Sequence, residues 1–285
     1  MMHQLRTIGA GDGRTVLLVV AHADDVALFL GGTVAAWADA NWRVVVVRVT
    51  DDRWDSVGLD EQTTIDANAA DLRESCRILG VTEIVELGWP TDVLGDASEV
   101  ALRERIIREV RRQRPYALVS FDPYSMFGED NQDHVVVARA VDEAFWTSQF
   151  GLHHPEHLTE GLVPHGCFER WYFGRRVMEV TDVVDISATL LRKVDAGCAH
   201  GTMLRNYANQ LVLQARTGGW VLPIASAVVT SGDPRPLIEP LLRAGAAQTG
   251  EPYGVAAAEE FRIVTFGGLG AVLDRFGTRM PGGPT

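Results

Sequence analysis

Two runs of consecutive apolar residues predict strands that are buried on both faces of a sheet. Residues 15–20 read Thr-Val-Leu-Leu-Val-Val, and residues 42–50 read Trp-Arg-Val-Val-Val-Val-Arg-Val-Thr. Continuous β-branched runs are typical of parallel sheets that helices cover on both faces. Shorter runs at 82–87 and 117–121 predict a third and a fourth strand.

Helical periodicity fills the segments between and after these strands. Small and apolar residues recur at helical spacing over 26–38, 64–79, 99–112 and 134–146. Strands that alternate with helices predict an α/β fold, with a Rossmann-like, doubly wound and mostly parallel sheet, right-handed crossovers and helices on both faces.

The pattern changes after residue 150. Residues 171–184 predict two short strands added to the sheet, and 187–216 predict one long helix. A mixed region and a Gly/Pro-rich tail follow, and we expect the tail to be mobile. No linker divides the sequence, so we expect a single domain over 1–285, with a core of about 14–150 and a C-terminal α/β extension of about 151–285.

Four histidines gather just after the core, at His153, His154, His157 and His165. Their spacing is irregular, which disfavours a metal site. We interpret this segment as a surface loop.

Composition narrows the class of partner. With a net charge of −12, the chain lacks the excess of positive charge that would neutralise phosphates, so we expect no nucleic-acid partner. Three widely spaced cysteines imply neither a disulfide framework nor a thiolate zinc site. No apolar run reaches membrane-spanning length or forms a secretory signal, so we expect a cytoplasmic protein without a membrane partner. The oligomeric state stays open, and a homo-oligomer is compatible with the sequence.

Candidate chemistry gathers where strands end. His22, Asp24 and Asp25 lie in the turn between the first strand and its helix, the edge where open α/β sheets bind ligands. Asp133 and His134 follow the fourth strand, so both clusters can project into one crevice. The structural alternative is that Asp24 or Asp25 caps the first helix and Asp133 caps the later one.

Two motifs resemble those of a known family. Ala21-His22-Ala23-Asp24-Asp25, followed by Leu30-Gly-Gly-Thr, resembles the Ala-His-Pro-Asp-Asp signature of the zinc-dependent PIG-L (LmbE-like) N-acetylglucosaminyl de-N-acetylases. Asn131-Gln-Asp133-His134 resembles the second motif of that family, often His-Pro-Asp-His. The resemblance extends to 79–81, 193–200 and 259–262, and so covers most of the chain.

The resemblance implies a catalytic metal site. His22, Asp25 and His134 would bind one Zn²⁺, and Asp24 would be the general base. Two imidazoles and one carboxylate with an open position suit catalytic zinc, although iron, cobalt or nickel would also bind. A carboxylate beside the metal can take the proton of a water and return it to the leaving amine.

The chain departs from the family pattern in ways that concern the turn and the substrate. Ala23 replaces the usual Pro, which loosens the turn. Asn131 stands where many relatives have a His; it can donate a hydrogen bond to an oxyanion but supplies no proton. Asp133 matches the residue often credited with orienting that His. Asn68 stands where an Arg often contacts substrate.

Aromatic residues paired with carboxylates in loops at this edge suit the faces and hydroxyls of a sugar ring. The alternative is that these aromatic residues only pack the loops. The candidates are Trp54, Asp55, Trp89, Asp92, Tyr124 and Phe127.

We therefore expect a zinc-dependent amidohydrolase that removes an acetyl or other small acyl group from the amine of an N-acylated amino sugar or glycoside. The alternatives are a thiol-conjugate amidase of the same family and a catalytically silent metal- or sugar-binding relative. Asp24 argues against the silent relative, because a binding site needs no base.

Overall fold

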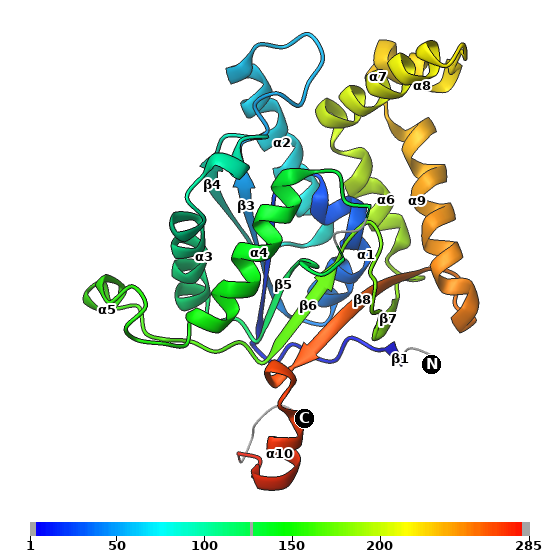
Figure 1. Ribbon diagram of the computed structural model, residues 1–285. Helices are drawn as coiled ribbons and strands as arrows, with labels where there is room; N and C mark the ends of the chain where they lie inside the picture. The colour runs from blue at the N-terminus through cyan, green and yellow to red at the C-terminus, as the bar shows by residue number, and fades with distance from the viewer. Residues whose placement is uncertain (1–3, 126–127, 281–285) are drawn as a thin grey trace.

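A mixed sheet of eight strands forms the centre of the molecule. The computed structural model of the chain describes residues 4–125 and 128–280. The strand order is β1-β7-β8-β6-β5-β2-β3-β4 (Figure 1). The strands are β1 (Gln4–Arg6), β2 (Thr15–Val20), β3 (Arg43–Thr50), β4 (Glu83–Trp89), β5 (Ala117–Phe121), β6 (Glu169–Phe173), β7 (Asp182–Asp185) and β8 (Ala258–Thr265).

Most neighbouring strands are parallel, as the sequence predicts. The pairs from β4 through β3, β2 and β5 to β6 are all parallel, and so is the pair of β1 with β7. Only β8, among the described strands, runs antiparallel, between β6 and β7. The predicted α/β fold is confirmed, and β6, β7 and β8 of the C-terminal part join the same sheet as the core.

Helices cover both faces of this sheet. They are α1 (Asp25–Asp39), α2 (Glu61–Leu79), α3 (Glu99–Gln113), α4 (Gln132–Thr147), α5 (Glu156–Thr159), α6 (Leu190–Cys198), α7 (Gly201–Thr217), α8 (Pro223–Ser231), α9 (Arg235–Gly250) and α10 (Gly270–Phe276). Alternation along β2 separates two core layers: Leu18 packs with α1 and α2, and Leu17 packs with α3 and α4. Both layers close over β2, which fixes the turn that follows it.

The single helix predicted over 187–216 is wrong. The chain forms α6 and α7 instead, and it breaks at His200, where φ is −81° and ψ is 55°. The break lets α6 pack on α1 and α2 while α7 packs on α8. Continuous helical periodicity hides this change of partner from the sequence.

Two further boundaries differ from the prediction. The helix expected from residue 64 begins at Glu61, because the Asp60 side chain caps it by accepting a hydrogen bond from the Thr63 N–H at 3.0 Å. The cap of α4 is Asn131, not Asp133: its Oδ1 accepts from the Asp133 N–H at 2.9 Å.

The histidine-rich segment holds the short helix α5 and is not wholly at the surface. His157 is fully buried, with Nε2 2.7 Å from Glu104 Oε1 and Nδ1 3.1 Å from Arg111 Nη1. Arg111 also donates to the carbonyls of Phe150 and His153. These contacts make His157 a structural residue of this segment.

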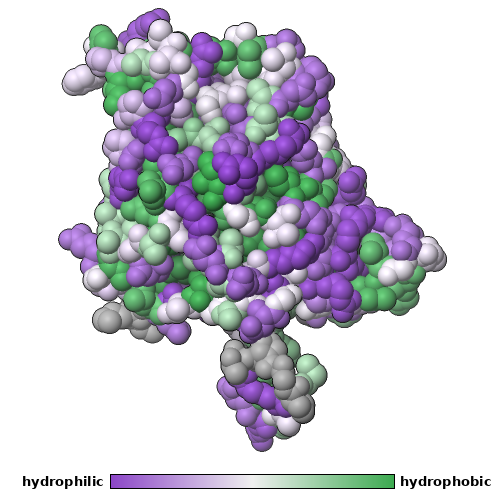
Figure 2. Space-filling model, turned by 180° about the vertical axis from the view of Figure 1, so that it is seen from behind, coloured by the Kyte–Doolittle hydropathy of each residue, from purple (hydrophilic) through white to green (hydrophobic). Residues whose placement is uncertain are grey.

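The outer surface mixes polar and apolar side chains, and α10 extends below the body (Figures 1 and 2). None of the described helices is long and apolar enough to cross a membrane. Part of the Gly/Pro-rich tail, residues 281–285, lies outside the described residues.

Candidate metal centre

The site lies where the order of strands reverses. From β2 the chain continues to β3 on one side, and β5 pairs with β2 on the other, which makes the end of β2 a topological switch point. A bend at 21–24 leads from β2 into α1, whose first residue is Asp25. The Asp25 Oδ2 accepts a hydrogen bond from the His22 N–H at 2.8 Å, which folds the turn back on itself.

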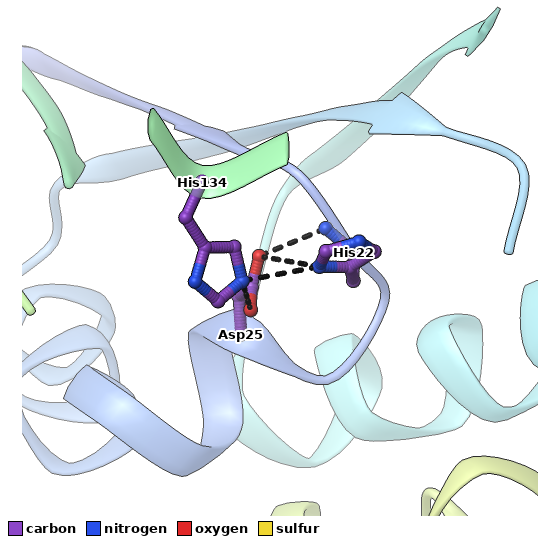
Figure 3. Close-up of side chains that lie close together, drawn as sticks. All are labelled: His22, Asp25 and His134. Carbon is purple, nitrogen blue, oxygen red and sulfur yellow. Dashed lines mark hydrogen bonds and ion pairs between the residues drawn. The ribbon is translucent and has the colours of Figure 1, made fainter. Parts of the chain in front are cut away.

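Three buried side chains from both predicted clusters meet at this point. His22, Asp25 and His134 each offer one ligand atom, and these atoms lie within 4.8 Å of one another (Figure 3). His22 Nδ1 is 3.1 Å from His134 Nε2, and Asp25 Oδ1 is 3.2 Å from the same nitrogen. Asp25 Oδ2 is 3.8 Å from His22 Nδ1.

A second carboxylate stands behind each imidazole. Asp133 Oδ2 lies 3.5 Å from His22 Nε2, and Glu129 Oε2 lies 3.1 Å from His134 Nδ1. A carboxylate at the outer nitrogen favours a proton there and leaves the inner nitrogen as a lone pair. Two such lone pairs and the Asp25 carboxylate then face one another, an arrangement that a cation would stabilise.

The spacing of these donors fits a tetrahedral metal ion. Metal–ligand bonds of about 2.0–2.1 Å at tetrahedral angles separate ligand atoms by about 3.3 to 3.4 Å. The two nitrogens are 3.1 Å apart, and the distances to Asp25 are 3.2 Å from His134 Nε2 to Oδ1 and 3.8 Å from His22 Nδ1 to Oδ2. One donor atom from each residue lies within 4.8 Å of the other two. The described residues therefore fit a divalent metal with two imidazole ligands and one carboxylate ligand.

Burial and charge shift the protonation of these groups in opposite directions. Burial lowers the pKa of His134, but the Asp25 and Glu129 carboxylates outweigh it and raise that pKa to about 9. Burial raises the pKa of Asp25, but His134 outweighs it and holds that pKa well below its usual range. The cluster therefore keeps Asp25 ionised.

Asp24 differs from its neighbour. It occupies the N-cap position of α1, yet within the described part of the chain its side chain makes no capping hydrogen bond. Burial, with repulsion from Asp25, raises the pKa of Asp24 to about 8. The Asp24 carboxylate thus neither caps the helix nor supplies a ligand atom to the cluster.

The predicted substrate residues differ in their burial and in their contacts. Burial, with the Asp52 carboxylate, raises the pKa of Asp55 to about 7. Asp92 is exposed, but its N–H donates to Asp133 Oδ2 at 2.7 Å. Trp54 is 51% exposed, whereas Trp89 is partly buried against the core.

Tyr124 and Phe127 gain less support. The Tyr124 hydroxyl donates to Asp142 Oδ2 at 3.4 Å, and the Arg262 guanidinium lies over its ring. The Tyr124 side chain therefore contacts α4 and β8. Phe127 lies outside the described residues.

Sequence reasoning missed three residues of the site. Glu129 and Asp52 lie in the loops after β5 and β3, where acidic residues are too common to stand out. Tyr207 on α7 gave no signal, although the Asp24 carboxylate, together with burial, raises the pKa of its phenol. Asn68 is buried and its Nδ2 donates to the Asp52 carbonyl at 3.1 Å, so it holds this loop.

A protein-family model described as PIG-L, GlcNAc-PI de-N-acetylase, matches residues 17–145. Over these residues the chain is similar to the PIG-L family. Both clusters of the metal centre lie inside the matched PIG-L range, which confirms the resemblance seen in the motifs.

Two curated PIG-L relatives are named as deacetylases. The 1D-myo-inositol 2-acetamido-2-deoxy-alpha-D-glucopyranoside deacetylase of Mycobacteroides abscessus is 27% identical over 159 residues, which span 47% of this chain and 57% of the relative. The diacetylchitobiose deacetylase of Thermococcus kodakarensis is 28% identical over 189 residues, which span 64% of this chain and 68% of the relative. The matches thus cover little more than half to two thirds of these proteins.

The fold extends beyond the matched range. The N,N'-diacetylchitobiose deacetylase of Pyrococcus horikoshii superposes with a TM-score of 0.72 at 23% identity, covering 89% of this chain and 85% of that one. The C-terminal strands and helices are therefore part of the shared fold.

Proposed function

We propose that this chain is a metal-dependent hydrolase that removes an acetyl group from the amine of an N-acetylated amino sugar or glycoside. The observation that carries the proposal is the buried His22, Asp25 and His134 set inside a PIG-L domain, with Asp24 beside it. The names of the two curated relatives support the same reaction.

His22, Asp25 and His134 would hold the metal, for which we propose Zn²⁺. When bound, zinc would supply a Lewis acid for the amide carbonyl and lower the pKa of a water molecule. Asp133 and Glu129 keep the two imidazoles in the orientation that the ligand nitrogens need.

Asp24 is the proposed general base. It takes a proton from the attacking water and returns it to the amine as the C–N bond breaks, so that acetate and a free amine are formed. Asn131 remains a proposed hydrogen-bond donor to the amide oxygen. We propose that Trp54, Asp55, Trp89 and Asp92 contact the sugar, and that Asp133 acts only through His22.

We also infer that the protein works in a reducing compartment such as the cytoplasm. Cys76, Cys167 and Cys198 are free thiols, and the first two are buried.

Acetate release tests the function. The metal-loaded protein is incubated with N,N'-diacetylchitobiose, an N-acetylglucosaminyl inositol and an acylated amino-sugar thiol conjugate. We expect acetate from an acetamido sugar, with loss of activity on chelation and recovery with Zn²⁺. Cleavage of the thiol conjugate alone would favour the amidase alternative, and no cleavage by a stoichiometrically loaded protein would favour the silent relative.

A further inference from the structure

Asp52 holds an unusual backbone conformation next to the metal centre. It lies two residues after Thr50, the last residue of β3, is 0% exposed and has a φ of +55°. Residues other than glycine adopt this left-handed region at a cost, and such conformations persist only where the surroundings hold them. The contacts of its side chain show what holds this one.

The Asp52 carboxylate is shared by three donors. Its Oδ2 accepts from the Ala23 N–H at 3.0 Å and from Arg48 Nη1 at 3.2 Å. Its Oδ1 accepts from the Thr50 hydroxyl at 2.8 Å. Only the bond from Ala23 reaches the turn that carries the metal ligands.

Ala23 stands between a proposed ligand and the proposed base. A residue at this position sets how far His22, Asp24 and Asp25 lie from one another, because the bend at 21–24 holds all of them. Alanine alone fixes no backbone angle. Proline would fix φ near about −65°, but it would also remove the N–H that Asp52 binds.

We propose that Asp52 is a positioning residue: its carboxylate, through the Ala23 N–H, holds the turn in the geometry that binds the metal. The inference rests on the proposed function in taking His22, Asp25 and His134 as metal ligands. A proline at position 23 would make the turn rigid through its own ring. In this chain a hydrogen bond between two loops, from the Ala23 N–H to Asp52, would do the same.

The main alternative explanation is that Asp52 acts through its negative charge. The Asp52→Asn substitution distinguishes this charge role from the hydrogen-bond role. In Asp52→Asn the amide oxygen can still accept from Ala23 and Arg48, while its NH₂ donates to the Thr50 hydroxyl. The hydroxyl then donates to the Ala21 carbonyl, 2.7 Å away. A hydrogen-bond role therefore survives this change, and a charge role does not.

The test measures the affinity for Zn²⁺ by competition with a chromophoric chelator. Loss of a partner behind a metal site typically weakens affinity by about 10- to 100-fold, and we expect this for Asp52→Ala. Asp52→Asn should bind zinc nearly as the original chain does. The matched control is Asp51→Ala, because Asp51 is buried next to Asp52 but bonds with Arg53 in its own loop.

A double-mutant cycle with Ala23→Pro isolates the bond itself. In the proline background the N–H is already absent, so Asp52→Ala should cost much less affinity than it does beside Ala23. This comparison holds whether or not proline alone changes the affinity. If Asp52→Ala does not yield folded protein by circular dichroism, Asp52→Ser completes the same cycle.

Three results would overturn the inference: Asp52→Ala binding zinc like the original chain, Asp52→Asn as weak as Asp52→Ala, or equal losses in the alanine and proline backgrounds. Since zinc affinity is the readout, absence of acetate release from every variant would count against the proposed function and not against the positioning role.

Discussion

Two adjacent aspartates at the end of β2 have different surroundings. Asp25 contacts both imidazoles of the metal centre, whereas Asp24 contributes no ligand atom to it. In the proposed function, one residue type would provide both a metal ligand and a base within a single turn.

Asp24→Asn should leave the affinity for zinc nearly unchanged and remove most turnover. The amide is close in size but accepts no proton, and a positioned base contributes about 10²- to 10⁴-fold to rate. Measuring kcat together with the zinc content checks this, with Asp51→Asn as the control. Near-normal kcat in the zinc-loaded variant would contradict the assignment of Asp24 as the base.

Glu129 should matter through His134. Its carboxylate lies 3.1 Å from the outer nitrogen of that ligand. Glu129→Ala should weaken zinc binding by about 10- to 100-fold, while Glu129→Gln, which keeps an acceptor oxygen, should lose far less. Equal zinc affinity of the alanine variant and the original chain would show that His134 needs no such partner.

Asn131 combines a structural contact with a proposed catalytic one, and two substitutions separate them. Asn131→Ala removes the helix cap and should lower the free energy of unfolding by about 1 kcal/mol. Asn131→Asp keeps the cap but removes the donor, and should lower kcat by about 10²- to 10³-fold at nearly unchanged stability. If kcat of Asn131→Asp with full zinc stayed unchanged, Asn131 would be a cap alone.

At the residue scale, the proposed metal ligands could be predicted from the sequence, but the residues that contact them could not. His22, Asp25 and His134 could be predicted because two imidazoles and a carboxylate follow strands whose ends meet at one edge of the sheet. Glu129 acts over a distance of five residues along an irregular loop, and no periodicity fixes the direction of its side chain. Tyr207 approaches from a helix in the C-terminal part, which only the tertiary fold could reveal.

At the scale of elements, α1 is a helix with a break. A buried ion pair makes hydrogen bonds with the backbone groups on both sides of that break. Leu30 leaves the helical region, with φ −135° and ψ 22°. Glu259 accepts from the N–H groups of Gly32 and Thr33 at 3.0 and 2.8 Å. Lys193 donates to the Phe29 carbonyl at 3.0 Å and pairs with Glu259 at 2.6 Å.

Lys193→Met should therefore destabilise the fold strongly. It leaves the Glu259 carboxylate buried without its partner, a change that typically costs about 3–5 kcal/mol. Lys193→Met combined with Glu259→Gln should recover part of this, because the amide oxygen still accepts from the backbone. Chemical denaturation measures both, and a loss below about 1 kcal/mol for Lys193→Met would contradict the role of the pair.

The pattern of apolar residues predicted a helix or strand correctly where the whole segment packs against the same neighbouring elements. The runs at β2 and β3 and the helices between them follow directly from burial on two faces. The pattern failed at His200, because helical periodicity continues along the segment while its packing partner changes from α1 to α8. The place of β8 between β6 and β7 depends on pairing over long separations, which no local signal records.

At the scale of the whole molecule, metal binding should stabilise the fold. The ligands come from the β2–α1 turn and from α4, so only the folded chain assembles them. A metal at 100 times its Kd adds about 2.7 kcal/mol to the free energy of unfolding. Thermal unfolding should therefore shift upward with zinc in the original chain and much less in His134→Asn. Equal shifts in both would place the bound zinc elsewhere.

The position of Glu259 has a consequence for protein synthesis. The carboxylate that completes the N-terminal helix α1 lies 226 residues after Thr33, on the strand β8. A ribosome therefore makes the turn at residues 21–24 long before it makes the residue that secures the helix after it. The strands β7 and β1 also reach the rest of the sheet only through β8. A chain that lacked β8 would leave the edge of β6 unpaired and α1 without the Glu259 carboxylate, so we expect it to fold less stably.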